Sequence, residues 1–375
     1  MSKETDRIAS GEQEKQALTG IRERIDQIDD EMLALLNERA TLAVTVGQIK
    51  KAASPDVPPV FYRPEREAQI LKRLKDANAG PLTNEAIAHL FREVISCCLN
   101  LEQPLTIAYL GPRGTYTESA TIKHFGHSST TLALGGIDDV FREVEAGIVH
   151  YGVVPVENST EGMVNHTLDC FMTSALSICA EVEIPIHHAF MVHPDNVDGV
   201  VTEVISHSQS LAQCRGWLDT HHRDIKKTAV SSNAEAARIV AGRPDAASIG
   251  GEINAEYYGL RLLATRIEDD PNNKTRFLVI GNQDVGPSGH DKTSILVSTK
   301  NTSGALFSVL EPFHRNQISL TRIEARPARS GDWSYVFFID FCGHQRDPKI
   351  SDVLREVRGV ALEVRVLGSY PQGVS

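Results

Sequence analysis

Apolar residues recur at alternating spacings of three and four between Leu18 and Ile49, and this pattern limits the fold of the chain more than any other feature. Such spacing places apolar side chains in one stripe along a helix and is typical of a coiled-coil seam. We therefore predict a long helix with little core of its own. One position of the seam is charged, namely Arg39. The apolar positions of the seam are Leu18, Ile21, Ile25, Ile28, Met32, Leu35, Leu42, Val46 and Ile49.

Two further helical patterns follow this first helix. Prolines at 55, 58 and 59 should break the chain between 52 and 60, because proline lacks an amide donor and restricts the residue before it. A second helix is predicted from about Pro64 to Asp76. A third should begin near Thr83 or Asn84 as its N-cap and stop before Pro104. The segment is therefore predicted to be all-helical.

The predicted secondary structure changes from all-helical to mixed at Pro104. Short β-rich runs alternate with helical patterns up to about residue 283, which indicates an α/β region with parallel strands, built as one domain or as two lobes. The last segment has the order β-α-β-β-α-β of a ferredoxin-like unit. The predicted organisation is a disordered tail at 1–17, a helical domain at 18–103, an α/β domain at 104–283, a linker at 284–291 and a ferredoxin-like domain at 292–375.

Composition excludes several classes of function. The 375 residues hold 38 Lys plus Arg against 49 Asp plus Glu, and this net charge of −11 argues against a nucleic acid or an anionic membrane as the main partner. The six cysteines form no C-x-x-C pair, so we expect reduced thiols in a cytoplasm. The N-terminus is polar and nowhere do about 18 apolar residues run together, so we expect no signal or membrane segment. Because glycine-rich nucleotide motifs and zincin motifs are missing, we expect chemistry without a cofactor or metal.

Two cations share one face of the first predicted helix. Lys50 lies eleven residues after Arg39, which is about 20° around the helix axis. One interpretation is that both side chains snorkel to solvent or pair with Glu67 and nearby aspartates. The other is a pocket for a small polyanion. Arg22 lies seventeen residues before Arg39, or about 25 Å along one helix, so a single small ligand can meet both only if two chains share the site.

The stretch IRERIDQIDDEMLALLNERATLAVTVGQIK, followed by RPEREAQIL, resembles the all-helical chorismate mutases that are fused to prephenate dehydratase. The resemblance implies an intertwined dimer in which cations orient the two carboxylates of chorismate and a donor meets its ether oxygen. Glu102 replaces a frequent Gln, Cys98 a frequent Ser, and Arg63 stands where some members have Asp. The implied catalytic positions are Arg39, Lys50 and Glu102, and the implied substrate-binding positions are Arg22, Arg66, Glu67 and Cys98.

Five motifs of the α/β region, taken together and in their order along the chain, resemble those of prephenate dehydratase. They are GPRGTYT, VPVENSTEGMVNHTLD, SHSQSLAQC, SSNAEAA and NKTRF. This implies two lobes of periplasmic-binding-protein type with substrate between them. Thr275 is the implied donor at the leaving hydroxyl and Arg276 the carboxylate clamp, while Glu157 is either a catalytic carboxylate or a structural partner of a basic group. Four histidines, among them His166 and His188, show no metal spacing. The remaining substrate contacts implied are Thr115, Asn158, Ser159, Thr160, Ser206, Gln213, Ser232 and Phe277.

The segment NTSGALFSVLEPFHRNQISLTRIEARP resembles the ACT domain that binds phenylalanine in these enzymes. Its second motif is usually Glu-Ser-Arg-Pro, and Ala325 replaces the serine here. An ACT fold that only dimerises is the alternative. The implied effector contacts are Asn301, Gly304, Ala305, Leu306, Glu324, Ala325, Arg326 and Pro327.

Taken together, the resemblances imply a cytoplasmic enzyme, dimeric or larger, that converts chorismate through prephenate to phenylpyruvate and is inhibited by phenylalanine. A mutase joined to a dehydrogenase is a rival that the missing G-x-G-x-x-G disfavours. A ligand sensor without chemistry is a second rival, and release of phenylpyruvate from prephenate would exclude it.

Overall fold

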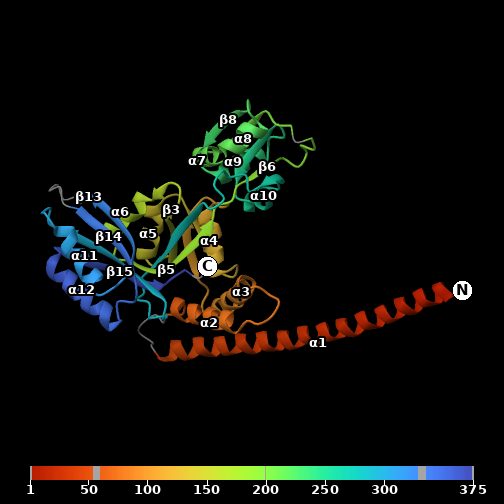
Figure 1. Cartoon of the computed structure of the whole chain (residues 1–375), viewed down its shortest axis with the longest axis horizontal. Coiled ribbons are helices and arrows are strands. Elements are labelled where there is room, and N and C mark those ends of the chain that lie inside the picture. Colours follow the sequence, from red (N-terminus) through yellow and green to blue (C-terminus); the bar gives the residue numbers. More distant parts are fainter. Residues whose placement is uncertain (1, 54–59, 199, 328–334, 374–375) are drawn as a thin grey trace. The chain divides into compact units, whose positions relative to one another are not determined.

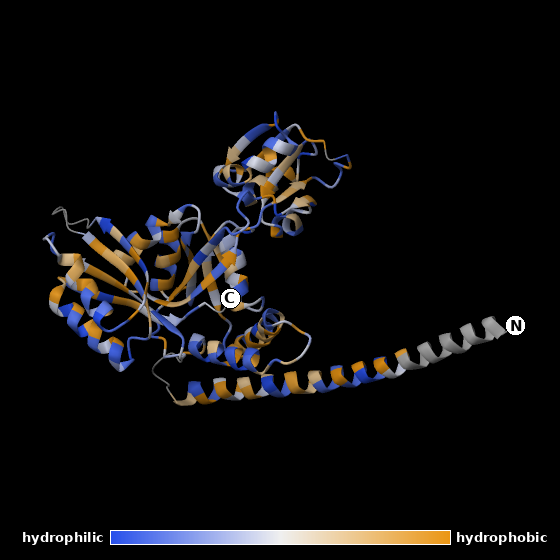
Figure 2. Cartoon of the chain, in the orientation of Figure 1, coloured by the Kyte–Doolittle hydropathy of each residue, from blue (hydrophilic) through white to orange (hydrophobic). Residues whose placement is uncertain are grey.

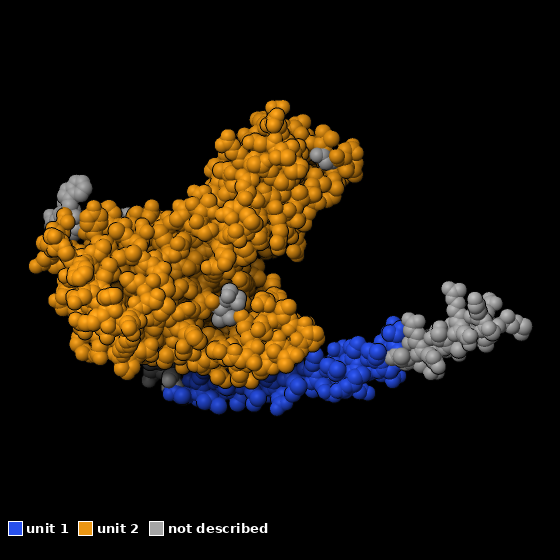
Figure 3. Space-filling model, in the orientation of Figure 1, with its two compact units in different colours: residues 1–61, 94–104 blue, residues 62–93, 105–375 orange. Residues whose placement is uncertain are grey.

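The structure is a computed structural model of the whole chain, and it describes residues 2–53, 60–198, 200–327 and 335–373, with side chains described from residue 18 onward (Figure 1). The chain divides into two compact units (Figure 3). The first unit comprises residues 1–61 and 94–104, and the second comprises residues 62–93 and 105–375. Each unit is described by itself below.

The first unit is built on one long helix, α1 (Ser2–Ala53). The predicted helix is confirmed over 18–49, but the tail expected at 1–17 differs, because α1 begins at Ser2. This segment is rich in Glu, Lys, Gln and Ala, which favour helices. The seam residues are exposed, with Ile21 57% and Leu35 64% accessible. Figure 2 shows apolar positions recurring along α1. The three prolines expected to break the helix lie outside the described residues.

Two shorter helices complete the helical part, as predicted. They are α2 (Pro64–Ala77) and α3 (Asn84–Glu102). Proline at the first position of α2 suits a helix start, where its missing amide hydrogen has no helical acceptor. The last turns of α3 belong to the first unit, and the rest of α3 and all of α2 belong to the second. Among the described helices, none is long and apolar enough to cross a membrane.

The α/β region forms two lobes, each with its own sheet, which confirms the two-lobed prediction. The first sheet has the order β2-β1-β3-β11-β5, with β4 paired to β3. Strands β1, β2 and β3 are parallel, whereas β11 is antiparallel to both β3 and β5. Its strands and helices are β1 (Thr106–Leu110), α4 (Tyr116–Phe125), β2 (Thr130–Leu134), α5 (Ile137–Glu145), β3 (Tyr151–Asn158), β4 (Gly162–Met163), α6 (Asn165–Thr173), β5 (Ser177–Pro185) and β11 (Lys274–Gly281).

The second lobe is inserted between β5 and β11, and its sheet has the order β10-β6-β9-β7-β8. Strands β7, β8 and β9 are parallel, and β6 is antiparallel to β9 and β10. The expectation of parallel strands is therefore corrected, because β6, which enters the second lobe, and β11, which re-enters the first, run antiparallel to their neighbours. Its elements are β6 (Ala189–Val192), β7 (Glu203–His207), α7 (Ser208–Gln213), α8 (Arg215–His221), β8 (Lys226–Val230), α9 (Asn233–Val240), β9 (Ala246–Gly250), α10 (Ile253–Tyr258) and β10 (Arg261–Thr265).

The C-terminal segment has the predicted β-α-β-β-α-β order and an antiparallel sheet β13-β14-β12-β15. One face of this sheet packs on its two helices, and the other shares a core with the first lobe through Leu296, Phe338 and Tyr370. At Gly368 an added Cβ would lie 2.2 Å from the carbonyl oxygen of Ile178, so the two sheets touch there. The elements are β12 (Asp291–Thr299), α11 (Ala305–Arg315), β13 (Leu320–Pro327), β14 (Tyr335–Cys342), α12 (Pro348–Val360) and β15 (Glu363–Pro371).

Candidate active sites

The helical unit brings Lys50 of α1 to Glu102 at the end of α3. Lys50 Nζ lies 3.7 Å from Glu102 Oε2, and both side chains are largely buried. One turn before Lys50, Gly47 passes Glu102 closely enough that an added Cβ would lie 3.4 Å from its Cα. Arg39 points toward the same helix, with Nη1 3.5 Å from the carbonyl oxygen of Val94. Two cations and one carboxylate thus face one region of the unit.

Glu102 is the most unusual group of this cluster. Burial raises the pKa of its carboxyl, while the nearby charges of Lys50 and Arg39 lower it, and the net direction is upward. Its Oε2 atom is buried without a hydrogen-bond partner among the described residues. Cys98, one helical turn earlier, is also buried. Arg22 lies on the exposed part of α1, away from this cluster in sequence and along the helix axis.

Two predicted mutase contacts belong to the second unit. Glu67 of α2 pairs with Arg92 of α3 at 3.4 Å, and burial raises the pKa of its carboxyl. The predicted pairing of Glu67 with a cation is therefore seen, but the cation is Arg92 and not Arg39 or Lys50. Arg66 is exposed.

In the α/β domain, strands β3 and β11 bring Asn158 and Thr275 opposite each other. The side-chain amide of Asn158 donates to Thr275 Oγ1 at 2.9 Å. The orientation of this amide is fixed, because Asn158 Oδ1 accepts from the backbone N–H groups of Thr160 and Glu161, both at 3.0 Å. An amide N–H can only donate, so the hydroxyl of Thr275 keeps its own proton available.

Asn273 completes this group, although the sequence analysis did not select it. Its Oδ1 accepts from Asn158 Nδ2 at 2.9 Å and lies 3.3 Å from Ser159 Oγ. Its Nδ2 is buried without a partner among the described residues. The sequence could have pointed to Asn273, because this residue is the first of the NKTRF motif that contains Thr275.

The second lobe contributes polar groups at the ends of β7 and β8. Ser206 is fully buried, and its hydroxyl lies 3.0 Å from Asn233 Oδ1 and 2.7 Å from the carbonyl of Ile249. Ser232 is the N-cap of α9 and accepts from the amide of Glu235 at 3.0 Å. Ser232 is thus brought to this end of the sheet as a helix cap.

Thr115 has the same kind of role in the first lobe. It is the N-cap of α4, where its hydroxyl accepts from the amide of Glu118 and donates to the carbonyl of Leu110. Its neighbour Gly114 has φ +89°, and the Gly114 carbonyl accepts from Asn254 Nδ2 at 3.0 Å. This hydrogen bond joins the two lobes.

Gln213 lies at the connection between the lobes. Its Oε1 meets His188 Nε2 at 2.9 Å, and His188 Nδ1 meets the hydroxyl of Tyr116 at 2.9 Å. Burial lowers the pKa of His188, which favours a neutral ring there. The Nε2 atom of Gln213 is buried without a partner among the described residues, so it is a donor that a ligand could use.

Arg276, the predicted carboxylate clamp, lies on the other face of strand β11 from Thr275. Successive strand residues point to opposite faces, so Arg276 points away from Thr275. Its guanidinium lies 3.1 Å from Glu181 and 3.0 Å from Asp340 of the C-terminal domain. Glu157, opposite Arg276 on β3, pairs with Arg322 of β13, which favours the structural alternative for Glu157. Phe277 follows in the strand and is fully buried in the core.

The predicted effector residues lie at the start of α11 and along β13. Gly304 is the N-cap of α11 with φ +80°, a region that favours glycine. Arg326 is engaged within the chain, because its guanidinium lies 2.8 Å from Asp169 of α6. Glu324, Ala325 and Pro327 belong to β13. Asn301 precedes α11 and is exposed.

These features define a class, namely a multidomain enzyme for small anionic metabolites that carries a C-terminal regulatory domain. Residues 21–103 match the chorismate mutase type II family, residues 107–285 match prephenate dehydratase, and residues 293–359 match the ACT domain. The chain belongs to the family of bifunctional chorismate mutase/prephenate dehydratases.

Relatives with that description match over nearly their whole length. The protein of Stutzerimonas stutzeri is 54% identical over 362 residues, which is 96% of this chain and 99% of the relative. That of Pseudomonas aeruginosa is 53% identical, covering 95% and 98%. Among solved structures, prephenate dehydratase from Arthrobacter aurescens in complex with L-Phe has a TM-score of 0.65 and 33% identity, covering 71% of this chain and 90% of that one.

Proposed function

We propose that the helical part converts chorismate to prephenate and that the α/β domain converts prephenate to phenylpyruvate. The observation that carries the second reaction is the Asn158–Thr275 hydrogen bond, whose direction leaves the threonine proton free for a substrate hydroxyl. Prephenate takes up one proton from solvent and loses its ring hydroxyl as water and its ring carboxylate as CO₂, and the ring becomes aromatic. Threonine is a weak acid, so Thr275 stabilises the leaving hydroxyl by hydrogen bonding.

The mutase reaction is a rearrangement that needs no nucleophile. Arg39 and Lys50 supply positive charge for the carboxylates of chorismate, and Glu102 in its protonated form donates to the ether oxygen as negative charge develops there. Burial supports the protonated form, since it raises the pKa of this carboxyl.

The test of the dehydratase assignment compares Thr275→Val with Thr275→Ser, measured by the absorbance of phenylpyruvate formed from prephenate. Loss of one positioned donor should lower kcat by about 10²–10³-fold in the valine variant. The serine variant keeps the hydroxyl and should retain most activity, and both should retain mutase activity. Binding of prephenate without release of phenylpyruvate by the unmodified chain would instead identify a ligand sensor.

We also propose phenylalanine as the inhibitor, bound by the C-terminal domain near Gly304. Supporting this site, Gly304 begins α11 in the left-handed region with open space around its Cα. Asparagine tolerates this backbone region, so Gly304→Asn adds a side chain at little conformational cost. The variant should lose inhibition and keep its basal rate. Unchanged inhibition would place the effector elsewhere.

The exposed seam of α1 supports a homodimer or larger assembly, because an apolar stripe of this length is unfavourable in water. Sedimentation should give a mass of at least two chains, and Ile28→Glu within the seam should lower it. We further propose a reducing compartment, the cytoplasm, because the six cysteines of the sequence form no C-x-x-C pair and no regular disulfide framework.

A further inference from the structure

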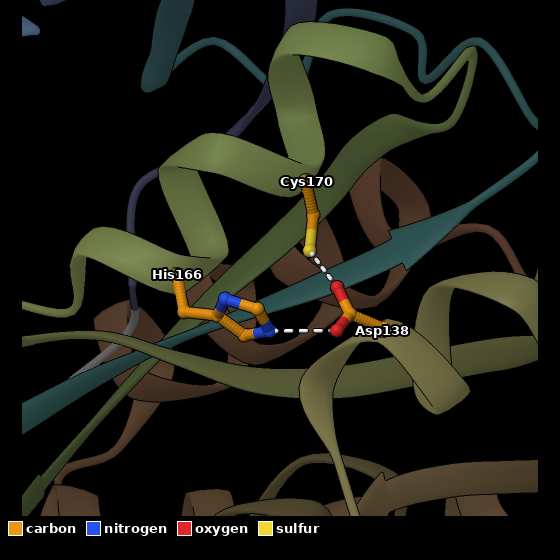
Figure 4. Close-up of side chains that lie close together, drawn as sticks. All are labelled: Asp138, His166 and Cys170. Atoms are coloured by element: carbon orange, nitrogen blue, oxygen red, sulfur yellow. Dashed lines mark hydrogen bonds and ion pairs between the residues drawn. The ribbon is translucent and has the colours of Figure 1, made fainter.

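Three side chains of the first lobe converge on one point outside the sites described above (Figure 4). Asp138 lies in the first turn of α5, and His166 and Cys170 lie four residues apart on α6, on one helix face. His166 Nε2 is 2.9 Å from one oxygen of Asp138, and Cys170 Sγ is 3.0 Å from the other. Among the residues that the structure describes, this is the one group of at least three His, Cys, Asp or Glu side chains whose ligand atoms all lie within 4.8 Å of one another.

An imidazole nitrogen, a thiolate and a carboxylate form a donor set suited to zinc. Zinc binds sulfur at about 2.3 Å and nitrogen or oxygen at about 2.0–2.2 Å, so the ligand atoms of one tetrahedral ion lie about 3–4 Å apart. The thiolate disfavours magnesium and calcium, which prefer oxygen ligands. In the metal-free state the Asp138 carboxylate accepts hydrogen bonds from the Cys170 thiol and from Nε2–H of His166. Zinc binding would release the thiol proton to solvent and leave the imidazole proton on Nδ1, so that Nε2 offers its lone pair to the metal.

The surroundings leave room for an ion and one further ligand. The three side chains border a cavity of about 220 Å³ on the lobe surface. Two other carboxylates of this cavity are already engaged, because Glu145 accepts from the hydroxyl of Ser174 and Asp169 pairs with Arg326. The nearby cation Arg142 is held by Asp139 at 2.6 Å. Water is therefore the remaining candidate for a fourth ligand.

We propose that Asp138, His166 and Cys170 bind one zinc ion per chain, with water in the fourth position. The ion would link α5 to α6. The same helix α6 follows the loop that carries Ser159 and Thr160, and it presents Asp169 to strand β13. The sequence analysis found no metal spacing for His166, because the third ligand lies 28 residues before it on another helix.

The experiment measures zinc uptake by the full-length protein after removal of metals by a chelator. Zinc is titrated near neutral pH against a chromophoric competitor, and we expect one equivalent per chain. His166 is half exposed, so His166→Gln should fold normally and should weaken binding by at least about tenfold, since even partners of metal ligands contribute ten- to hundredfold. Cys97→Ser, which removes an exposed thiol on α3, is the matched control and should bind like the unmodified chain.

A cobalt titration reports the thiolate directly. Cobalt bound at the site should give a sulfur-to-metal charge-transfer band that is lost in Cys170→Ser and kept in Cys97→Ser. Melting temperatures in chelator identify any variant that is destabilised, and zinc should raise the melting temperature of the unmodified chain but not of His166→Gln. Absence of zinc uptake by the unmodified chain, or equal affinity in His166→Gln, would overturn the proposal.

Discussion

At the scale of single residues, the direction of one hydrogen bond governs what Thr275 can do. Asn158→Asp is nearly isosteric and still accepts from the backbone amides of Thr160 and Glu161, so the loop should keep its form. A carboxylate cannot donate, and Thr275 would turn its own proton toward the aspartate. We expect dehydratase kcat to fall by about 10²-fold or more, because the donor at the leaving hydroxyl is lost.

The measurement compares phenylpyruvate formation with mutase activity in the same preparation, because the proposed mutase residues Arg39, Lys50 and Glu102 lie in the first unit. Glu161→Ala is the matched control, since Glu161 binds Asn158 through its backbone N–H. Wild-type turnover by Asn158→Asp would show that Thr275 does not donate to the substrate.

Glu102 gives a second prediction at this scale, which concerns pH. Only the protonated carboxyl can donate to the ether oxygen, so the active form is the one present below its pKa. Burial raises this pKa, and therefore mutase kcat/KM should fall as pH rises through a value above the ordinary range of glutamate. Glu102→Gln keeps a donor at all pH values and should give a flat profile with higher activity than the unmodified chain at high pH.

The control for this profile is dehydratase activity, which does not involve Glu102 and should keep its own pH dependence in the glutamine variant. An unchanged mutase profile in Glu102→Gln would remove this residue from the ether oxygen and leave Arg39 and Lys50 as the supported part of the site.

The motifs predicted residues for the dehydratase site, but not the contacts that these residues make within the chain. Thr115 and Ser232 stay predicted substrate contacts, and the structure shows in addition that both are N-caps. The signal was available, because each is followed three residues later by glutamate, the pattern of a capping box. Asn273 could also have been selected from its motif. The partner of Glu67 could not have been selected from the sequence, because Arg92 reaches Glu67 only through packing of α2 on α3.

At the scale of elements, strand β11 separates two roles by alternation. Thr275 faces Asn158, whereas Arg276 faces Glu181 and Asp340, so the strand links the dehydratase site to the C-terminal domain. Asp340→Asn should weaken this link and reduce inhibition by phenylalanine severalfold while the basal rate changes little. The fold should persist, because Arg276 keeps Glu181 and asparagine can still accept from Ser294.

This prediction is checked by phenylalanine titrations of dehydratase activity, with melting curves recorded alongside. Asp352→Asn is the matched control, since Asp352 is an exposed aspartate on α12 that pairs with Arg355. Equal loss of inhibition in both variants, or unchanged inhibition in Asp340→Asn, would show that this contact does not transmit the signal.

The order of elements in the fold was largely predictable, since periodicity and turn residues are local properties. The helices α1, α2 and α3 and the β-α-β-β-α-β order were confirmed. Strand direction was not predictable, because it depends on where the chain crosses between lobes. The partners of Arg276 were not predictable either. Alternation predicts that Arg276 and Thr275 point to opposite faces, but only the packing of the C-terminal sheet brings Asp340 to the face of Arg276.

At the scale of the whole molecule, α1 is continuous between Arg22 and Arg39, which are about 25 Å apart along its axis. If both serve mutase sites, each site takes Arg22 from one chain and Arg39 from another. We therefore expect Arg22→Ala and Arg39→Ala each to be inactive as mutases and to regain activity when mixed. In a mixed dimer one site carries both substitutions and the other carries neither, so random exchange should restore about a quarter of the sites' activity.

Mass spectrometry of intact dimers measures the exchange, and dehydratase activity is the control for folding. No recovery in fully exchanged dimers would mean that each site is built from a single chain, and Arg22 would then act elsewhere.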